Sequence, residues 1–169
     1  MATVIGTNRR TVIAAIVSAA FGKSLPALNT AEPAPKFYAK TMDGEKFDNQ
    51  SLKGRVVLLQ FWTTWCPVCK RDQESVEIIV REYTPKGLVV LAVDVNESKK
   101  RVKKYLEESP RSPKIVLTED TNLAAIFEAK SFPRYIVINR DGNLSGEQNG
   151  AGGDQSLRRL LAKAGLRDD

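Results

Sequence analysis

The chain has 169 residues, the length of one domain, and its 42% hydrophobic residues suffice for an ordinary core. Its formal net charge is +6, and it contains two cysteines, two methionines and no histidine. A zinc site usually needs four Cys, His or carboxylate ligands, and a copper carrier is expected to offer histidine or methionine ligands. The composition therefore argues against both kinds of metal protein.

Residues 1–31 differ in composition from the rest of the chain. They carry three basic residues and no acidic one, and an apolar run at 11–21 follows Arg9 and Arg10. This pattern is typical of an export signal, and the apolar run is too short to span a bilayer unaided. We expect 1–31 to be an export signal or short anchor with its leader, and 32–169 to be the folded domain. The sequence leaves open cleavage or anchoring, and the Sec or twin-arginine route.

The next segments predict a hairpin followed by central strands. Residues 36–47 contain Asp43-Gly44, a strong tight-turn signal, and are expected to form an N-terminal β-hairpin. The apolar runs at 55–61 and 88–95 are continuous rather than alternating, which predicts strands buried on both faces. Residues 70–83, between these two runs, are expected to be helical.

A basic cluster lies within the helix expected at 97–109. The basic residues at 99–104 resemble a nucleic-acid-binding patch at first sight. The net charge of the chain without the three basic residues of the leader is, however, only +3. Moreover, Val102, Tyr105 and Leu106 form an apolar helical stripe, and glutamates flank the lysines. We expect a solvated helix face, no nucleic-acid partner, and membrane contact only through an uncleaved N-terminal segment.

The C-terminal third predicts two more strands, a hairpin and two helices. A short strand is expected at 115–117, then a helix capped by Asp120, then a strand at 135–138. A turn leads into 144–148 as a second hairpin, and a final helix ends near Gly165. This alternation predicts an α/β fold, a mixed central sheet covered by helices on both faces.

The only two cysteines, Cys66 and Cys69, are three positions apart, between a predicted buried strand and a predicted helix. A helix N-terminus has unsatisfied N–H groups and a partial positive charge, which favour thiolate over thiol. Pro67 suits the first helical position. The spacing in this context predicts a redox-active dithiol. An inert structural disulfide is the alternative, although so short a loop gains little stability from closure.

Two motifs at their characteristic separation carry a family resemblance: Phe61-Trp62-Thr63-Thr64-Trp65-Cys66-Pro67-Val68-Cys69 and Ser131-Phe132-Pro133-Arg134-Tyr135-Ile136-Val137-Ile138-Asn139-Arg140-Asp141-Gly142. With them the chain resembles the thioredoxin superfamily, and most of all its exported TlpA/ResA-type thiol–disulfide oxidoreductases. The resemblance covers about 36–165. It implies a thioredoxin-like fold, and the predicted N-terminal hairpin matches that subgroup.

The resemblance also implies roles for individual residues. Cys66 would be the exposed nucleophile, Cys69 the more buried resolving thiol, and Pro133 a cis-proline that aligns a substrate strand opposite the cysteines. The exposed surroundings of the pair, Trp65, Pro67, Phe132 and Pro133, would contact the substrate.

Two positions next to the pair are distinctive. Gln60 stands where cytosolic thioredoxins carry a buried aspartate, so that acid/base group is missing. Asp72, three residues after Cys69, matches a carboxylate position of the ResA-like subgroup. It could assist proton transfer at Cys69, or simply be a favourable charge near the helix start, and the sequence leaves both interpretations open.

These features predict an exported, periplasmic or extracytoplasmic thiol–disulfide oxidoreductase without a bound cofactor. Nothing in the sequence supplies the strong thiolate stabilisation that an oxidant needs, so we expect a reductant of client protein disulfides. The resemblance adds apocytochromes, before haem attachment, as candidate clients. Because exchange only relays electrons, a second thiol–disulfide partner must regenerate the dithiol.

Two other functions stay open at this stage. One is a binding module that uses the same fold without turnover. The other is a peroxidase of the peroxiredoxin type, for which Thr63 stands at the required distance before Cys66, although the usual proline and arginine companions are not evident.

Overall fold

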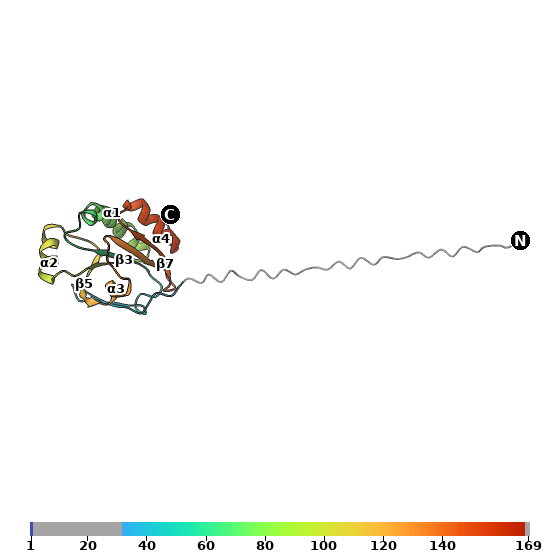
Figure 1. Cartoon of the computed structure of the whole chain (residues 1–169), viewed down its shortest axis with the longest axis horizontal. Coiled ribbons are helices and arrows are strands. Elements are labelled where there is room, and N and C mark those ends of the chain that lie inside the picture. Colours follow the sequence, from blue (N-terminus) through green and yellow to red (C-terminus); the bar gives the residue numbers. More distant parts are fainter. Residues whose placement is uncertain (2–31, 168–169) are drawn as a thin grey trace. The chain divides into compact units, whose positions relative to one another are not determined.

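The computed structural model describes residue 1 and residues 32–167 (Figure 1). The expected export segment lies outside the described residues, so its extent and its boundary with the folded domain stay predictions. Within the described part of the chain, no helix is long and apolar enough to cross a membrane.

A seven-stranded mixed sheet forms the centre of the described domain, with strand order β2-β1-β5-β4-β3-β6-β7. The middle strands β5, β4 and β3 are parallel to one another, and the other neighbouring pairs are antiparallel. The bounds are β1 Tyr38–Thr41, β2 Lys46–Asp48, β3 Val56–Trp62, β4 Leu88–Asp94, β5 Lys114–Thr121, β6 Arg134–Ile138 and β7 Leu144–Asn149. This confirms the predicted α/β fold and both hairpins.

The two central strands are buried along their whole length, as their continuous apolar runs predicted. They pair in parallel from Val56 opposite Leu88 to Trp62 opposite Asp94. Because successive side chains point to opposite faces, each strand supplies two apolar surfaces. The sheet must therefore be covered on both sides.

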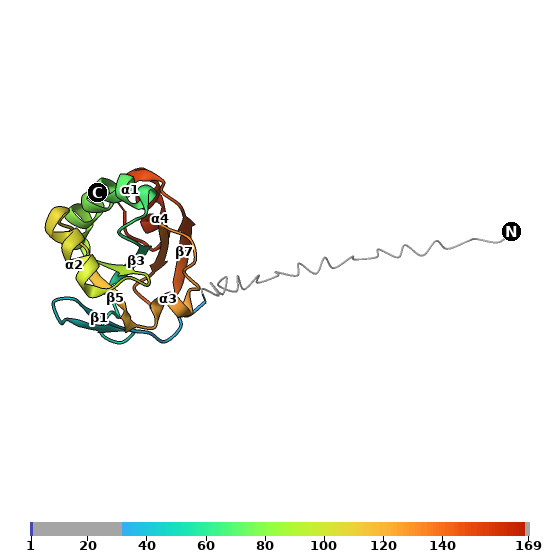
Figure 2. The same cartoon turned by 60° about the vertical axis from the view of Figure 1, so that its left-hand side comes forward.

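Helices cover both faces of the sheet. The helices are α1 Pro67–Tyr83, α2 Lys99–Glu108, α3 Leu123–Ile126 and α4 Gly153–Lys163, with a 3₁₀ turn at Thr84–Lys86. Helices α1 and α4 pack side by side over the face that contains Val56 and Leu58 (Figure 2). Helix α2 packs farther along this face through Val102, and α3 packs on the opposite face through Leu123. The lysines of α2 are exposed and Val102 is buried, which confirms the solvated helix face.

One local prediction is wrong: Asp120 does not cap a helix. Strand β5 continues to Thr121, because it pairs first with β4 and then with β1, so Asp120 lies within a strand. The Thr121 hydroxyl, rather than the Asp120 carboxylate, accepts a hydrogen bond from the Leu123 N–H, at 3.1 Å. Pairing between distant strands has overridden the local capping signal.

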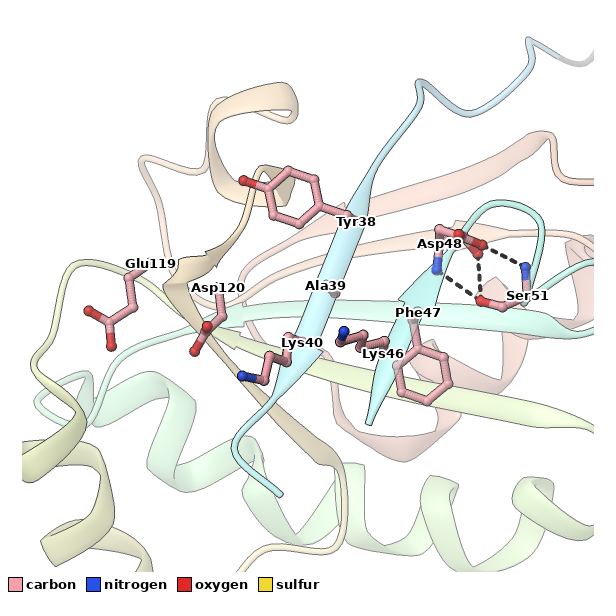
Figure 3. Close-up of a pocket in the computed structure, with 9 residues that line it drawn as sticks. All are labelled: Tyr38, Ala39, Lys40, Lys46, Phe47, Asp48, Ser51, Glu119 and Asp120. Atoms are coloured by element: carbon pink, nitrogen blue, oxygen red, sulfur yellow. Dashed lines mark hydrogen bonds between the residues drawn. The ribbon is translucent and has the colours of Figure 1, made fainter. Parts of the chain in front are cut away.

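A hollow of about 400 Å³ lies at the edge of the sheet formed by β2, β1 and β5 (Figure 3). It is lined by Tyr38, Ala39, Lys40, Lys46, Phe47, Asp48, Ser51, Glu119 and Asp120. None of the residues that the sequence predicts for a functional site belongs to this lining.

Candidate active site

The chain brings its two cysteines together where β3 gives way to α1. Cys66 is the N-cap residue of α1 and Pro67 its first residue, as predicted. Cys66 and Cys69 form a disulfide with a Cα–Cα distance of 5.3 Å. The Cys69 N–H donates to Cys66 Sγ at 3.1 Å, so the sulfur takes the position of a capping oxygen. An N–H group directed at this sulfur favours its thiolate form after reduction.

The expected contrast in exposure between the two cysteines is wrong. Cys66 is 4% exposed and Cys69 is 3% exposed in this disulfide form. Both cysteines belong to one apolar cluster with Trp62, and Phe132 packs against that cluster. Sulfur pairing holds Cys66 within this cluster, while its neighbours Trp65 and Pro67 project into solvent.

An aromatic pair lies next to the disulfide. The Trp65 side chain is 57% exposed and meets Phe132 edge to face, with ring centroids 6.2 Å apart. The Phe132–Pro133 peptide bond is cis, as the resemblance implied. The fold thus gathers the cysteines, Trp65, Phe132 and Pro133 from two distant segments, and the roles of these residues in binding a substrate stay predictions.

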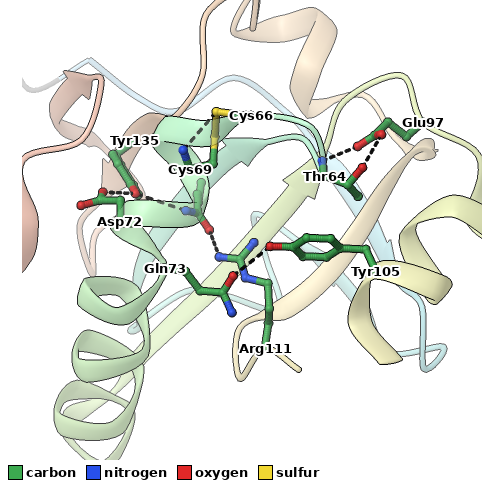
Figure 4. The surroundings of a disulfide bond; sticks show 10 residues. Thr64, Cys66, Cys69, Asp72, Gln73, Glu97, Tyr105, Arg111 and Tyr135 are labelled. Carbon is green, nitrogen blue, oxygen red and sulfur yellow. Dashed lines mark hydrogen bonds between the residues drawn. A yellow bond between two sulfur atoms is a disulfide. The ribbon is translucent and has the colours of Figure 1, made fainter. Parts of the chain in front are cut away.

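Asp72 is not a solvated residue of the helix surface, since it is only 3% exposed. Its Oδ2 accepts a hydrogen bond from the Tyr135 hydroxyl at 2.6 Å, and its Oδ1 accepts one from the Gly153 N–H at 3.2 Å. Positions three apart on a helix are neighbours, with about 5–6 Å between Cβ atoms, which places Asp72 one turn below Cys69. The carboxylate is therefore buried, satisfied and close to the disulfide (Figure 4).

Two further side chains extend this polar group across the sheet. Gln60, which is fully buried, donates from Nε2 to the Tyr135 hydroxyl oxygen at 3.2 Å. Arg111, in the segment before β5, donates from Nη2 to Gln60 Oε1 at 2.7 Å. The guanidinium carbon of Arg111 lies 4.3 Å from the Trp62 ring centroid. Burial raises the pKa of the Tyr135 hydroxyl, and the neighbouring Asp72 raises it further.

A second polar group holds the loop that precedes Cys66. Glu97 accepts hydrogen bonds from the Thr64 N–H at 2.5 Å and from the Thr64 hydroxyl at 2.7 Å. Arg101 Nε lies 2.7 Å from the same carboxylate. Asp94, at the end of β4, is fully buried, and burial together with Glu97 raises the pKa of its carboxyl to about 8.

The sequence analysis did not identify three members of these two polar groups, Tyr135, Asp94 and Arg111. Tyr135 was assigned only to a strand, although a single hydroxyl in a run of aliphatic residues is a signal that could have been used. The same holds for Asp94 at the end of an apolar strand. Arg111 gave no local signal, because its partner Gln60 is 51 positions away.

Comparisons with known proteins agree with this geometry. A family model described as Redoxin matches residues 26–161. The chain is 28% identical over 130 residues to the thiol-disulfide oxidoreductase ResA of Halalkalibacterium halodurans, covering 77% of this chain and 74% of that protein. It is 30% identical over 125 residues to the thioredoxin-like protein YneN of Bacillus subtilis, covering 72% of each chain.

Solved structures show the same fold. A thiol:disulfide interchange protein of the thioredoxin family from Chlorobium tepidum matches with a TM-score of 0.69 and 27% identity, over 79% of this chain and 96% of that one. StoA from Bacillus subtilis matches with a TM-score of 0.65 and 22% identity, over 78% of this chain and 98% of that one. The chain therefore belongs to the Redoxin family, and within it to the TlpA/ResA-like thiol–disulfide oxidoreductases of the thioredoxin superfamily.

Proposed function

We propose that this protein is an exported reductant of client protein disulfides that cycles between a Cys66/Cys69 dithiol and the disulfide. The observation that carries the proposal is the position of the Cys66–Cys69 disulfide at the start of α1, with the Cys69 N–H donating to Cys66 Sγ. A dithiol at a helix N-terminus has one thiolate ready to attack.

The reaction requires two exchanges. The Cys66 thiolate attacks one sulfur of the client disulfide, which breaks that bond, forms a Cys66–client disulfide and releases the other client sulfur as a thiolate. Cys69 then loses its proton and attacks Cys66, which forms the Cys66–Cys69 disulfide and releases the second client thiolate. The client disulfide gains two electrons, and the protein dithiol loses them.

Asp72 is the group that we assign to the proton of Cys69. Its carboxylate lies one helical turn from Cys69, in surroundings that exclude water. It can accept the S–H proton as Cys69 attacks and return it as the client leaves. In this assignment Asp72 is a general base and acid, and it does not bind the client.

The direction of electron flow follows from how little stabilises the Cys66 thiolate. Pro67 has no N–H group, and Lys70 is exposed to solvent, which screens its charge. A strong oxidant needs a far more stabilised thiolate. A measured reduction potential near −120 mV, the value typical of such an oxidant, would contradict the reductant assignment.

The client surface that we propose consists of Trp65, Pro67, Phe132 and Pro133. The exposed Trp65 ring and the half-buried Phe132 ring form an apolar surface next to the disulfide. Aromatic side chains are enriched in the surfaces by which proteins bind one another. The composition of residues 1–31 supports export. Export would place the protein among apocytochromes and other exported thiol proteins, with a separate thiol–disulfide partner that regenerates the dithiol.

Trapping experiments test the proposal directly. A full-length Cys69→Ser variant cannot complete the second exchange, so client proteins should accumulate on Cys66 as mixed disulfides in the exported compartment. Cys66→Ser is the matched control and should trap almost none. If Cys69→Ser traps nothing and the wild-type protein reduces no disulfide, the binding-module alternative is correct. Consumption of peroxide by the purified protein would support the peroxidase alternative instead.

A further inference from the structure

Four side chains from four separate segments form one continuous hydrogen-bonded chain below the disulfide. It runs from Arg111 to Gln60 on β3, then to Tyr135 on β6, and ends at Asp72 on α1 (Figure 4). The three bonds measure 2.7, 3.2 and 2.6 Å. These residues are up to 75 positions apart in the sequence, so only the fold brings them together.

The chemistry of Arg111 fixes the direction of every bond in this chain. A guanidinium group is a donor only, so Gln60 must present its Oε1 to Arg111. The amide therefore turns its Nε2 toward Tyr135, and the Tyr135 oxygen accepts that bond. The hydroxyl proton of Tyr135 is then left for the remaining partner, the Asp72 carboxylate.

Burial keeps each of these hydrogen bonds in the same donor-to-acceptor direction. Gln60 and Tyr135 are fully buried, and Asp72 is 3% exposed, so bulk water cannot replace one partner by another. The Trp62 ring holds the Arg111 guanidinium from one side, at 4.3 Å. A polar group left unpaired in such surroundings is costly, which favours the arrangement in which all three of these hydrogen bonds form.

We propose that Arg111, Gln60 and Tyr135 are positioning residues that hold Asp72 as a hydrogen-bond acceptor and prevent it from passing a proton into the protein interior. The inference rests on the proposed function, in which Asp72 accepts the proton of Cys69. Because Tyr135 already donates to Asp72, a proton taken from Cys69 cannot leave through Tyr135. It must return on the disulfide side, to a departing client thiolate or to solvent at the opening of the site.

Other titratable side chains lie near Arg111 and near Asp72, the two ends of this hydrogen-bonded series. Glu77 on α1 and Tyr105 on α2 interact electrostatically with Arg111. On α4, next to the Gly153 N–H that binds Asp72, Asp154 is engaged by Arg158 at 3.4 Å. None of these groups donates to Asp72, and the donors to its carboxylate among the described residues are the Tyr135 hydroxyl and the Gly153 N–H.

The variant Gln60→Glu tests the direction of the chain with almost no change in shape. An ionised glutamate accepts from Arg111 and also accepts the Tyr135 O–H, so the hydroxyl proton turns away from Asp72. Tyr135→Phe removes the same donor by a different route and also serves if the first variant does not fold. In both full-length variants we expect the ¹³C resonance of the Asp72 carboxyl carbon to shift at pH 7 in the oxidised protein.

Exchange kinetics supply the second measurement. A carboxylate that loses this donor is no longer held in place beside Cys69, so exchange at neutral pH should slow by up to about tenfold in each variant. The double variant should behave like Tyr135→Phe alone, because both changes remove one and the same bond.

The two measurements separate the two hypotheses. If the Asp72 carbon resonance is unchanged in both variants, the positioning inference is wrong, even where exchange is slowed equally at every pH. If the resonance shifts and the double variant is not additive, the inference stands. A shifted resonance with an unaltered exchange rate would retain the positioning role of the three residues but refute the role of Asp72 in proton transfer under the proposed function.

Discussion

Two buried carboxyl groups, Asp72 on α1 and Asp94 at the end of β4, have completely different surroundings. Asp72 accepts from the Tyr135 hydroxyl and from the Gly153 N–H. Asp94 is fully buried, and as an ionised carboxylate neither of its oxygens has a hydrogen-bond partner among the described residues. Its neighbour is another carboxyl group, that of Glu97, to which it can donate only when protonated.

Hydrogen-bond donors, rather than depth of burial, distinguish these two carboxyl groups. Around Glu97 the donors are already taken: it receives the N–H and hydroxyl of Thr64 and pairs with Arg101. Although burial alone would raise the pKa of Glu97, the bonds from Asp94 and Thr64 lower it overall. Asp94 is left as the group that keeps the proton, with a pKa of about 8.

The largest effect is expected from removing the carboxylate of Asp72. Asp72→Asn keeps the shape but cannot accept the Cys69 proton, and general acid–base help is typically worth about 10²–10⁴-fold. We expect exchange at neutral pH to fall by at least about tenfold, with thiolate absorbance appearing at lower pH because a nearby negative charge is gone. Stopped-flow exchange with a model disulfide and an absorbance titration measure the two effects.

Asp94→Asn is the matched control for that experiment, since it removes a carboxyl group that is buried to the same depth. Its exchange rate should stay within about twofold of wild type. Equal losses in the two variants would show that burial of a carboxyl group near the loop, and not proton transfer by Asp72, explains the effect.

A second prediction concerns stability against pH. The pKa of Asp94 is raised from 3.8 to about 8, so its contribution to stability is complete below pH 4 and is lost as the pH rises through 8. The free energy of unfolding should fall over this range by up to about 1.4 kcal/mol per pH unit from this group alone. Urea denaturation at pH 5 and pH 8 measures the slope.

In Asp94→Asn this part of the slope should vanish, because the amide carries no titratable proton and its N–H group can still donate to Glu97. The variant should therefore be more stable than wild type at pH 8. A slope that persists unchanged would mean that Asp94 is already ionised near neutral pH, and that the contrast with Asp72 does not exist.

The smallest effect is expected at the loop itself. Thr64→Val removes the hydroxyl that donates to Glu97 and accepts from Arg101, but keeps the backbone N–H bond to Glu97. Loss of such a bond costs about 1–2 kcal/mol of stability, while exchange at neutral pH should hardly change. Thermal unfolding and exchange assays, with Thr64→Ser as the hydroxyl-retaining control, test this; a large loss of exchange would give the Glu97 group a direct part in the chemistry.

The sequence predicted those parts of the fold that local patterns determine. Continuous apolar runs identified β3 and β4, and turn signals identified both hairpins. The cis bond at Pro133 came from the family resemblance, not from composition or spacing. The cap at Asp120 was wrong, because strand pairing with β1 decided the end of β5.

Residue spacing predicted the candidate site only where its residues are close in sequence, and Phe132 and Pro133 came from the family resemblance. Cys66, Cys69 and Asp72 lie within one helical segment, so spacing was informative. Tyr135 and Arg111 reach the site from distant segments, and no periodicity records which buried hydroxyl will meet which carboxylate. The predicted exposure of Cys66 was wrong as well, since Cys66 is paired with Cys69 inside an apolar cluster that includes the distant residues Val102 and Leu117.

The residues on either side of helix α2 limit which segments could replace this helix in an engineered domain. Glu97 lies just before this helix and holds Thr64, while Arg111 lies just after it and orients Gln60. Residues 95–113 therefore contact the candidate site at two places, at Thr64 through Glu97 and at Gln60 through Arg111. A homologous segment grafted in their place would need both a carboxylate at its start and a guanidinium at its end. Local opening of α2 should likewise speed amide hydrogen exchange at both places at once, as one cooperative unit.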